Sequence, residues 1–440
     1  MLRKLWFTKR SATLAPLILG LLLGAAWAQT ETALYSFKGR SDGKSPLAGV
    51  VFDQKGNLYG TTSGGGLYNE GCYGYDSTCG VVFEITPEGQ ETVLYAFCAK
   101  ANCTDGDYPS DAPVFDQKGS LYGTTLNGGA HGQGVVFKLA PDGKETVLHS
   151  FCAKGGTNCT DGALPAAPLV FDQKGNLYGT TAGGGAHSFG VVFKLSPKGV
   201  ESVLYSFCAK GGTHCTDGSE PYAGLTFDRS GNLYGMTTVG GSIHSCGLGC
   251  GDGVVFKLTP EGKETVLYTF CTLANCADGS RSGEGAGVIF DQEGNLYGTT
   301  IVGGRIKSEC VYGCGVVFKL TPEGKEIVLY KFCALTNCTD GWDPDAGVIF
   351  DQKGNLYGTT GGGGFYNNKY CRYGGCGVAF KLAPNRKETV LHTFCAKGGT
   401  NCSDGANPSA GIIFDRKGNL YGTTALGGGY SSGVVFKVTP

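Results

Sequence analysis

Short apolar segments separated by glycine-rich turns recur along this chain. Between residues 49 and 97 the pattern predicts four strands, at 49–52, 57–62, 80–85 and 92–97. The third strand places Val81, Phe83 and Ile85 on one face, as expected for a residue period of two. An Asp-x-x-Gly turn and a Pro-x-Gly turn separate two of the strand pairs. No segment after residue 28 has the length and period of a helix, so the sequence predicts an all-β protein.

This four-strand unit occurs seven times. The phrase Asp-Gln-Lys-Gly-Asn-Leu-Tyr-Gly-Thr-Thr at 53–62 returns with small changes, at intervals of 56 to 64 residues. Its leading phenylalanine is found at Phe52, Phe115, Phe171, Phe227, Phe290, Phe350 and Phe414. A repeat of this length, filled with short strands, is typical of a β-propeller in which each repeat forms one blade.

The two ends of the repeat array complement each other. The seventh unit stops after its third strand, at 434–438, and the matching fourth-strand phrase lies near the other end of the chain, at 32–37. A ring closed by the N-terminal strand would leave no exposed sheet edge in its last blade. We therefore predict a seven-bladed β-propeller of four-stranded blades whose last blade contains the N-terminal strand.

Residues 1–28 have the pattern of a signal peptide. A basic segment containing Arg3 and Lys4 precedes an apolar run at 14–23, and Ala26-Trp27-Ala28 offers a small-residue cleavage site. The apolar run is shorter than the ~20 residues that span a bilayer. We expect one propeller domain at 29–440 without a transmembrane segment, secreted as a monomer to the periplasm, the cell surface or the medium.

The twenty cysteines fall into ten close pairs, and an even number in an exported protein predicts disulfides. Six pairs follow the fourth strands: Cys98/Cys103, Cys152/Cys159, Cys208/Cys215, Cys271/Cys276, Cys333/Cys338 and Cys395/Cys402. Four pairs lie in the glycine-rich loops: Cys72/Cys79, Cys246/Cys250, Cys310/Cys314 and Cys371/Cys376. The formal net charge of −1, without a basic run, argues against nucleic acid as a partner.

The Asp-x-x-Gly-Asn-Leu-Tyr-Gly-Thr-Thr phrase resembles propeller repeats of the NHL and two-component-regulator types. The fuller unit, with Gly-Val-Val-Phe-Lys-Leu-Thr-Pro and Val-Leu-Tyr-Ser-Phe, resembles the GloVer tandem repeat of exported bacterial choice-of-anchor proteins. The resemblance covers residues 31–440. It implies an exported bacterial β-propeller whose biochemical function is unassigned. In such propellers the Gly-Val-Val-Phe strand of residues 49–52 is innermost, which would place every cysteine pair on one face.

The most variable stretch of each unit precedes its innermost strand, at the expected mouth of a central funnel. The candidate ligand-binding residues there are Asp107, Tyr108, Asp111, Glu220, Tyr222, Arg281, Glu284, Trp342, Asp343 and Asp345. Aromatic rings mixed with carboxylates suit a glycan, and oxygen ligands would also suit a divalent cation such as calcium. The alternative is a set of variable, solvated loop residues without a ligand.

An Asp-Gly pair recurs in all seven of these loops, with aspartates Asp42, Asp105, Asp161, Asp217, Asp278, Asp340 and Asp404. Seven acids in a ring could bind one calcium ion per blade. However, Asp-Gly is also a common turn pair in which the carboxylate accepts hydrogen bonds from its own loop, and we favour this interpretation.

Two histidines offer the best catalytic candidates, because His131 and His187 occupy the same position in neighbouring glycine-rich loops. A lyase or hydrolase using them is therefore one alternative, and a purely structural envelope protein is another. The expectation we favour is a non-catalytic protein that binds an extracellular glycan or protein at the disulfide-rich funnel face.

Overall fold

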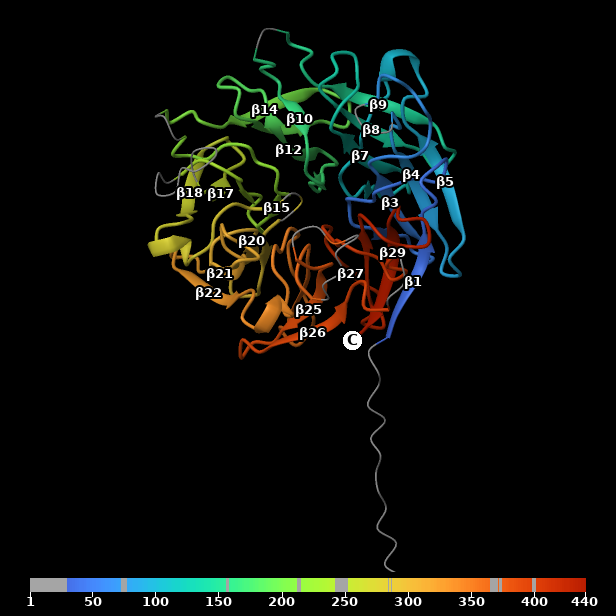
Figure 1. Cartoon of the computed structure of the whole chain (residues 1–440). Coiled ribbons are helices and arrows are strands. Elements are labelled where there is room, and N and C mark those ends of the chain that lie inside the picture. Colours follow the sequence, from blue (N-terminus) through green and yellow to red (C-terminus); the bar gives the residue numbers. More distant parts are fainter. Residues whose placement is uncertain are drawn as a thin grey trace, which may run out of the picture.

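The computed structural model describes residues 30–72, 77–155, 158–211, 215–241, 252–283, 285, 287–364, 371, 374–397 and 401–440. The predicted signal peptide lies outside the described residues, as do Cys246, Cys250 and Glu284. The described chain forms seven antiparallel sheets arranged as blades around a central axis (Figure 1).

The strands follow one order in every blade, from the axis outward. Blade 1 contains β2 (Val51–Phe52), β3 (Leu58–Thr62), β4 (Val81–Ile85) and β5 (Glu91–Ala96). Blade 2 contains β6 (Val114–Phe115), β7 (Leu121–Thr125), β8 (Val135–Leu139) and β9 (Glu145–Ser150). Blade 3 contains β11 (Val170–Phe171), β12 (Leu177–Gly183), β13 (Val191–Leu195), β14 (Glu201–Ser206) and the additional β10 (Ala163–Pro165).

Blade 4 contains β15 (Thr226–Phe227), β16 (Leu233–Met236), β17 (Val254–Leu258) and β18 (Glu264–Thr269). Blade 5 contains β19 (Ile289–Phe290), β20 (Leu296–Thr300), β21 (Val316–Leu320) and β22 (Glu326–Lys331). Blade 6 contains β23 (Ile349–Phe350), β24 (Leu356–Thr360), β25 (Val378–Leu382) and β26 (Glu388–Thr393). Short 3-10 turns, η1 (Ala101–Cys103), η2 (Ala274–Cys276) and η3 (Thr336–Cys338), follow three outer strands.

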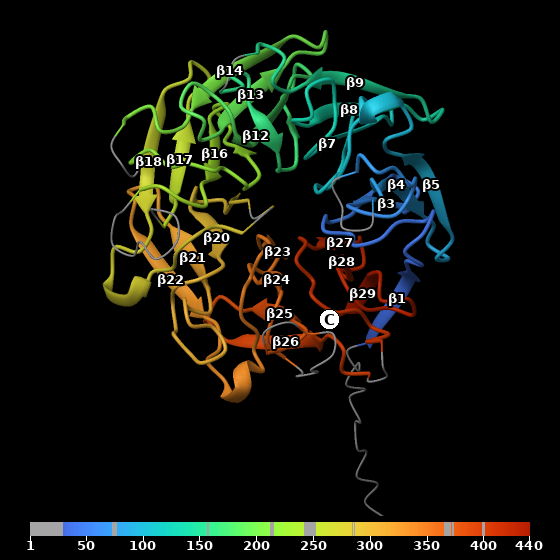
Figure 2. The same cartoon turned by 45° about the horizontal axis from the view of Figure 1, so that its top comes forward.

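Blade 7 closes the ring. It contains β27 (Ile413–Phe414), β28 (Leu420–Thr424), β29 (Val434–Thr439) and the N-terminal β1 (Thr30–Ser36). Strand β1 pairs antiparallel with β29, from Thr30 opposite Thr439 to Ser36 opposite Val434. Figure 2 shows this junction of the first and last parts of the described chain. The predicted fold and the predicted closure are confirmed.

The innermost strands are shorter than predicted, because only two residues of each join the ladder. In blades 1 and 6 the glycine before this strand packs closely against the backbone of a neighbouring blade. A Cβ on Gly49 would lie 2.9 Å from the carbonyl oxygen of Gly411, and one on Gly347 would lie 2.9 Å from that of Gly287. At these two places the blades approach one another backbone to backbone near the axis.

Aromatic rings from the repeat phrases join adjacent blades. A phenylalanine that follows each outer strand meets the phenylalanine of the third strand in the next blade, with centroids about 5 Å apart and edge-to-face geometry. The seven pairs are Phe37–Phe83, Phe97–Phe137, Phe151–Phe193, Phe207–Phe256, Phe270–Phe318, Phe332–Phe380 and Phe394–Phe436. The glycine of the Tyr-Gly-Thr phrase makes room for this ring, since a Cβ on Gly60 would lie 2.5 Å from Phe83 Cζ.

A second interblade contact uses the threonine of the same phrase. Thr423 Oγ1 in blade 7 donates a hydrogen bond of 2.7 Å to the carbonyl oxygen of Ala48 in blade 1. Thr299 and Thr359 make the equivalent bonds to Ala346 and Ala410. The Tyr-Gly-Thr-Thr phrase thus recurs because its residues fit one blade against the next.

Candidate ligand-binding face

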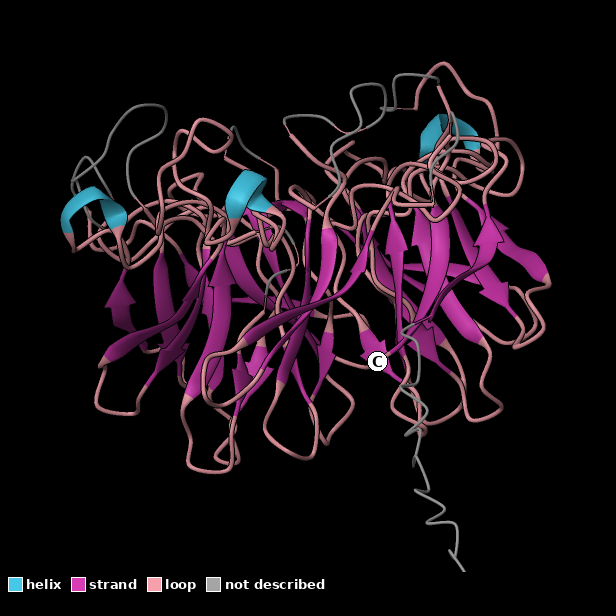
Figure 3. Ribbon diagram, turned by 60° about the horizontal axis from the view of Figure 1, so that its bottom comes forward, coloured by secondary structure: helices cyan, strands magenta, loops and turns pink. Residues whose placement is uncertain are grey.

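The two faces of the ring differ in the length of their connections (Figure 3). One face carries the glycine-rich loops between second and third strands and the loops that connect blades, and we call it the loop face. The opposite face, the turn face, carries the Asp-x-x-Gly and Pro-x-Gly turns. All three 3-10 turns lie in interblade loops and therefore on the loop face.

The described disulfides all lie on the loop face, in the predicted pairs. They are Cys72–Cys79, Cys98–Cys103, Cys152–Cys159, Cys208–Cys215, Cys271–Cys276, Cys310–Cys314, Cys333–Cys338, Cys371–Cys376 and Cys395–Cys402. In blade 1 the sulfur atoms of Cys72, Cys79, Cys98 and Cys103 lie within 4.8 Å of one another. The disulfide of the glycine-rich loop therefore packs against that of the interblade loop, and the two loops support each other.

In the loop that precedes each innermost strand, a single residue adopts a left-handed backbone conformation. The seven are Ser45, Tyr108, Leu164, Glu220, Arg281, Asp343 and Asn407, with φ between 52° and 62°. Each backbone N–H donates to a carbonyl of the preceding blade, as Asp343 does to Cys314 at 3.1 Å. Glycine would adopt this conformation at the lowest cost, yet none of the seven positions carries glycine. Four of the predicted ligand-binding residues, Tyr108, Glu220, Arg281 and Asp343, belong to this left-handed ring.

A cavity of about 350 Å³ lies on the axis, lined by residues from blades on opposite sides of the ring. Its wall is mostly small and apolar, and its polar side chains include the predicted Asp111 and Asp345. Asp111 is nevertheless buried, and its Oδ2 accepts a hydrogen bond of 2.9 Å from Thr124. Asp107 is buried as well, while Tyr222 is half-buried. Asp107 and Asp111 are thus more enclosed than the sequence suggested.

A smaller pocket of about 160 Å³ opens between blades 6 and 7, lined by the predicted Trp342 and Asp343 together with Asn407. Because Asn407 also lines the axial cavity, the two spaces adjoin. The Nε1 atom of Trp342 is buried and has no hydrogen-bond partner within the described protein. Burial raises the pKa of Asp343 to about 6.

The two catalytic candidates are not built into a site. His131 and His187 are exposed, and neither side chain contacts a hydrogen-bond or ion-pair partner in the part of the chain that the structure describes. Two other histidines are better positioned. His149 Nε2 lies 3.2 Å from Asp161 Oδ2, and His392 Nε2 lies 3.2 Å from Asp404 Oδ2.

These histidines belong to a joint that is repeated between all neighbouring blades. In five blades a tyrosine takes the place of the histidine, as where Tyr95 donates to Asp105 Oδ2 at 2.7 Å. Asp105 is fully buried and also accepts from the backbone N–H groups of Ala99 and Lys100. The Asp-Gly carboxylates thus accept hydrogen bonds from their own loops, as the turn interpretation expects.

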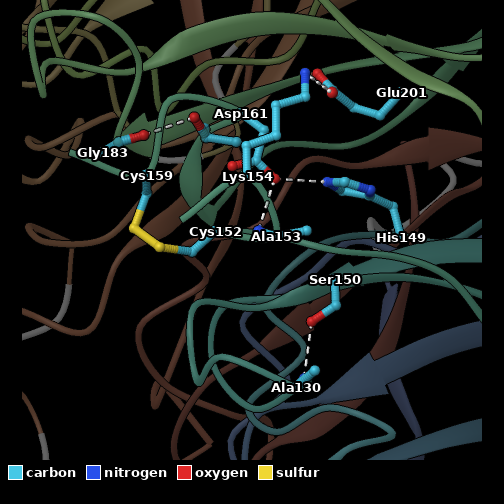
Figure 4. Close-up of polar contacts among 11 residues, drawn as sticks. Ala130, His149, Ser150, Cys152, Ala153, Lys154, Cys159, Asp161, Gly183 and Glu201 are labelled. Atoms are coloured by element: carbon cyan, nitrogen blue, oxygen red, sulfur yellow. Dashed lines mark hydrogen bonds and ion pairs between the residues drawn. A yellow bond between two sulfur atoms is a disulfide. The ribbon is translucent and has the colours of Figure 1, made fainter. Parts of the chain in front are cut away.

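A glutamate from the start of the next outer strand completes each joint. In four joints a lysine reaches it, as Lys154 reaches Glu201 in Figure 4. These ion pairs are Lys100–Glu145 at 2.6 Å, Lys154–Glu201 at 2.9 Å, Lys210–Glu264 at 2.6 Å and Lys397–Glu31 at 2.5 Å. The last pair links blade 6 to the N-terminal strand and so contributes to ring closure.

The other three joints have no such ion pair among the residues that the structure describes. Leu273 and Leu335 occupy the lysine position beside Glu326 and Glu388, and Glu91 faces Tyr35 and Asp42. Burial, followed by the charge of the neighbouring aspartate, raises the pKa of Glu91, Glu326 and Glu388 to about 7 in each case. The signal for the joint was present in the sequence, because six of the seven outer strands begin with glutamate and β1 has Glu31 at its second position.

Comparison with known families agrees with this architecture. The pattern of the Gloeobacter/Verrucomicrobia repeat matches residues 25–249, 72–304 and 247–440, which together span nearly the whole chain. The chain belongs to this repeat family. The resemblance drawn from the strand phrases is thereby confirmed. No curated protein matches the sequence.

Three solved structures are similar to this chain at low sequence identity. A candidate gluconolactonase is 13% identical, with a TM-score of 0.40 over 74% of this chain and 86% of its own. PorZ of Porphyromonas gingivalis, a surface component of the type-IX secretion system, is 13% identical, with a TM-score of 0.49 over 91% of this chain and 47% of its own. A luciferin-regenerating enzyme is 14% identical, with a TM-score of 0.40 over 74% of this chain and 90% of its own.

The nine disulfides indicate an oxidising compartment of the kind found outside the cytoplasm. Among the described residues, no helix is long and apolar enough to cross a bilayer.

Proposed function

We propose that this protein is an exported, non-catalytic binding protein that recognises an extracellular glycan or protein with its loop face. One observation supports this proposal above the others. Ten large apolar side chains are exposed in the described structure, and nine of them lie on the loop face: Leu67, Tyr68, Phe189, Leu273, Ile306, Val311, Tyr312, Leu335 and Tyr430. Because exposed apolar side chains favour one face, that face is the better candidate for an interaction surface.

The loops that carry these side chains are held in shape. Tyr312 follows Cys310 and precedes Cys314, and this disulfide fixes the loop tip on which the ring is exposed. A fixed aromatic side chain loses little conformational freedom when a ligand binds, so more of the contact energy is available for affinity. The left-handed ring supports the same proposal, because strained non-glycine residues collect at ligand-binding positions.

Binding to whole bacterial cells would test the proposal. The chain would be compared with a variant that replaces Tyr68, Tyr312 and Tyr430 by alanine, and with a control, Val200→Ala, which removes an exposed apolar side chain from the turn face. We expect the triple variant to bind at least about tenfold more weakly, equivalent to 1.4 kcal/mol, and the control to bind normally. Equal binding of the triple variant and the unchanged chain would refute the proposal.

Treating the cells with periodate or with protease before the assay would identify the ligand class. Periodate cleaves vicinal diols of glycans and leaves the protein backbone intact, whereas protease cleaves the protein backbone and leaves glycans intact. Loss of binding after periodate alone identifies the ligand as a glycan, and loss after protease alone identifies it as a protein.

A further inference from the structure

The pocket between blades 6 and 7 differs from the corresponding places in the other blades. Trp342 pairs through its backbone with Gly362, with N···O distances of 3.1 and 3.0 Å. The other described pairs at this position carry much smaller or flexible residues, such as Ser219 opposite Val239 and Ala406 opposite Leu426. Only blade 6 combines an indole with glycine here, and its glycine-rich loop begins with four consecutive glycines, at 361–364.

Two of these glycines create the space. A Cβ on Gly362 would lie 2.4 Å from Trp342 Cε2 and 2.7 Å from Nε1, so any side chain at this position would displace the indole. A Cβ on Gly361 would lie 3.0 Å from Asn407 Oδ1 and 3.5 Å from Asp343 Oδ2. The amide of Asn407 and the carboxylate of Asp343 therefore converge above Gly361, and a side chain there would fill the gap between them.

Three polar groups at this pocket have no partner within the described protein. They are the buried indole N–H of Trp342, the carboxylate of Asp343 and the side-chain amide of Asn407. A buried donor without a partner costs about 1–3 kcal/mol, which favours a ligand that supplies an acceptor. The walls are meanwhile well fixed, because Asp343 N–H donates to Cys314 and Asn407 N–H donates to Cys376, both disulfide-bonded cysteines of the preceding blade.

The chemistry of the three groups restricts the ligand. The indole offers a donor, the carboxylate offers acceptors, and the amide offers both. A hydroxyl group can donate and accept, so adjacent hydroxyls satisfy all three. A lysine or arginine side chain would pair with Asp343 and leave the indole N–H without an acceptor. Leu426 adds an apolar contact, which suits the C–H face of a sugar ring.

We propose that this pocket binds a single hydroxylated sugar ring, with Trp342, Asp343 and Asn407 as its polar contacts. The pocket has a volume of about 160 Å³, which is the volume that about five water molecules occupy in the liquid. It therefore accommodates part of one sugar ring. The rest of a glycan would extend into the adjoining axial cavity. The inference rests on the proposed binding function, and it selects glycan as the ligand class.

The test measures binding of free neutral hexoses and N-acetylhexosamines to the full chain by saturation-transfer NMR. We expect a saturable interaction with at least one sugar, with a Kd of about 1 mM. Trp342→Phe removes the indole N–H and keeps an aromatic ring, and Asp343→Asn keeps the shape and the left-handed preference of the residue. Each variant is expected to weaken binding at least about tenfold. The matched control is Asp142→Asn, which makes the same exchange at an exposed carboxylate of a Pro-x-Gly turn on the turn face and should leave binding unchanged.

Absence of binding by every sugar would overturn the inference, as would binding that survives in both pocket variants. Free lysine and arginine amides form a second arm of the test. If these cations bind in a way that the pocket variants abolish, and no sugar binds, the ligand of the pocket is a cationic side chain instead of a sugar ring. The cell-binding assay separates the two proposals. If the triple tyrosine variant fails to bind cells while Trp342→Phe and Asp343→Asn bind normally, the binding function stands and the pocket inference fails. If the unchanged chain does not bind cells, the binding function fails while the sugar titration still decides the pocket.

Discussion

Replacement of Leu335 by lysine should complete one of the three joints that have no ion pair. Leu335 precedes η3 with φ −93° and ψ 164°, and Lys100 precedes η1 with φ −101° and ψ 154°. The two side chains are therefore attached to backbones of nearly the same conformation. Because Lys100 Nζ reaches Glu145 at 2.6 Å, a lysine at position 335 is expected to reach Glu388 in the same way.

The magnitude follows from the titration of Glu388. Its pKa is raised from 4.5 to about 7, first by burial and then by the charge of Asp340. A raised folded-state pKa means that the native protein keeps a proton that the unfolded chain has lost. Stability from this group is therefore complete below about pH 4.5 and is lost as the pH rises toward 7. The shift corresponds to at most about 3 kcal/mol, at 1.36 kcal/mol per pH unit. Since solvent screens a pair whose lysine is half-exposed, we expect Leu335→Lys to recover about 0.5–1 kcal/mol.

The assay is thermal unfolding at about pH 5 and about pH 8. We expect Leu335→Lys to raise the midpoint at the higher pH and to change it little at the lower pH, where Glu388 is protonated. Leu335→Gln controls for the loss of an exposed apolar side chain and should show no such pH dependence. The reverse exchange, Lys100→Leu, should destabilise the protein mainly at the higher pH. An equal effect of Leu335→Lys at both pH values would refute the reasoning.

Three further predictions address the scaffold. Gly298→Ala places a Cβ 2.8 Å from Phe318 Cζ and should lower the free energy of unfolding by about 1–3 kcal/mol in denaturant titrations, whereas Gly411→Ala, with no atom within 4 Å, should have almost no effect. Thr423→Val removes the hydroxyl that bonds Ala48 across the ring closure and should cost about 1–3 kcal/mol, while an unchanged unfolding midpoint would exclude a contribution of this bond. Replacement of Cys333 and Cys338 by serine opens a disulfide of sequence separation 5 and should accelerate proteolysis near η3 without changing the far-ultraviolet circular dichroism. Cleavage rates equal to those of the unchanged chain would contradict this expectation.

The architecture could be predicted from the sequence because its determinants are repeated. The Tyr-Gly-Thr-Thr phrase returns in nearly every unit, and its residues make the same packing contacts each time, as where Gly60 leaves room for the ring of Phe83 in its own blade. The position of β1 could also be predicted, because the seventh unit lacks a fourth-strand phrase and the N-terminal segment contains one. Residues that recur in every unit are those that the packing of every blade requires, and the repeat therefore identifies them.

The candidate site was harder to predict because it depends on differences between blades. Asp107 and Asp343 occupy neighbouring positions of equivalent loops, yet Asp107 is buried while Asp343 lines a pocket. The contribution of Gly361 and Gly362 was visible only as a longer glycine run, since the space they create depends on the indole of Trp342 across the loop. The glutamates of the joints were overlooked because each acts on the preceding blade, far away in sequence. Glu145 lies 45 residues from Lys100, and Glu31 lies 366 residues from Lys397.

The pairing of Thr30 with Thr439 determines how the molecule is presented when it is held by an end. Both residues lie at the turn face, where the outer strand begins and the third strand of blade 7 finishes. A linker fused to either end of the described chain, or a sensor surface that captures it there, therefore attaches on the side opposite the exposed tyrosines. The loop face then points into the surrounding medium, accessible to a large ligand without steric interference from the support.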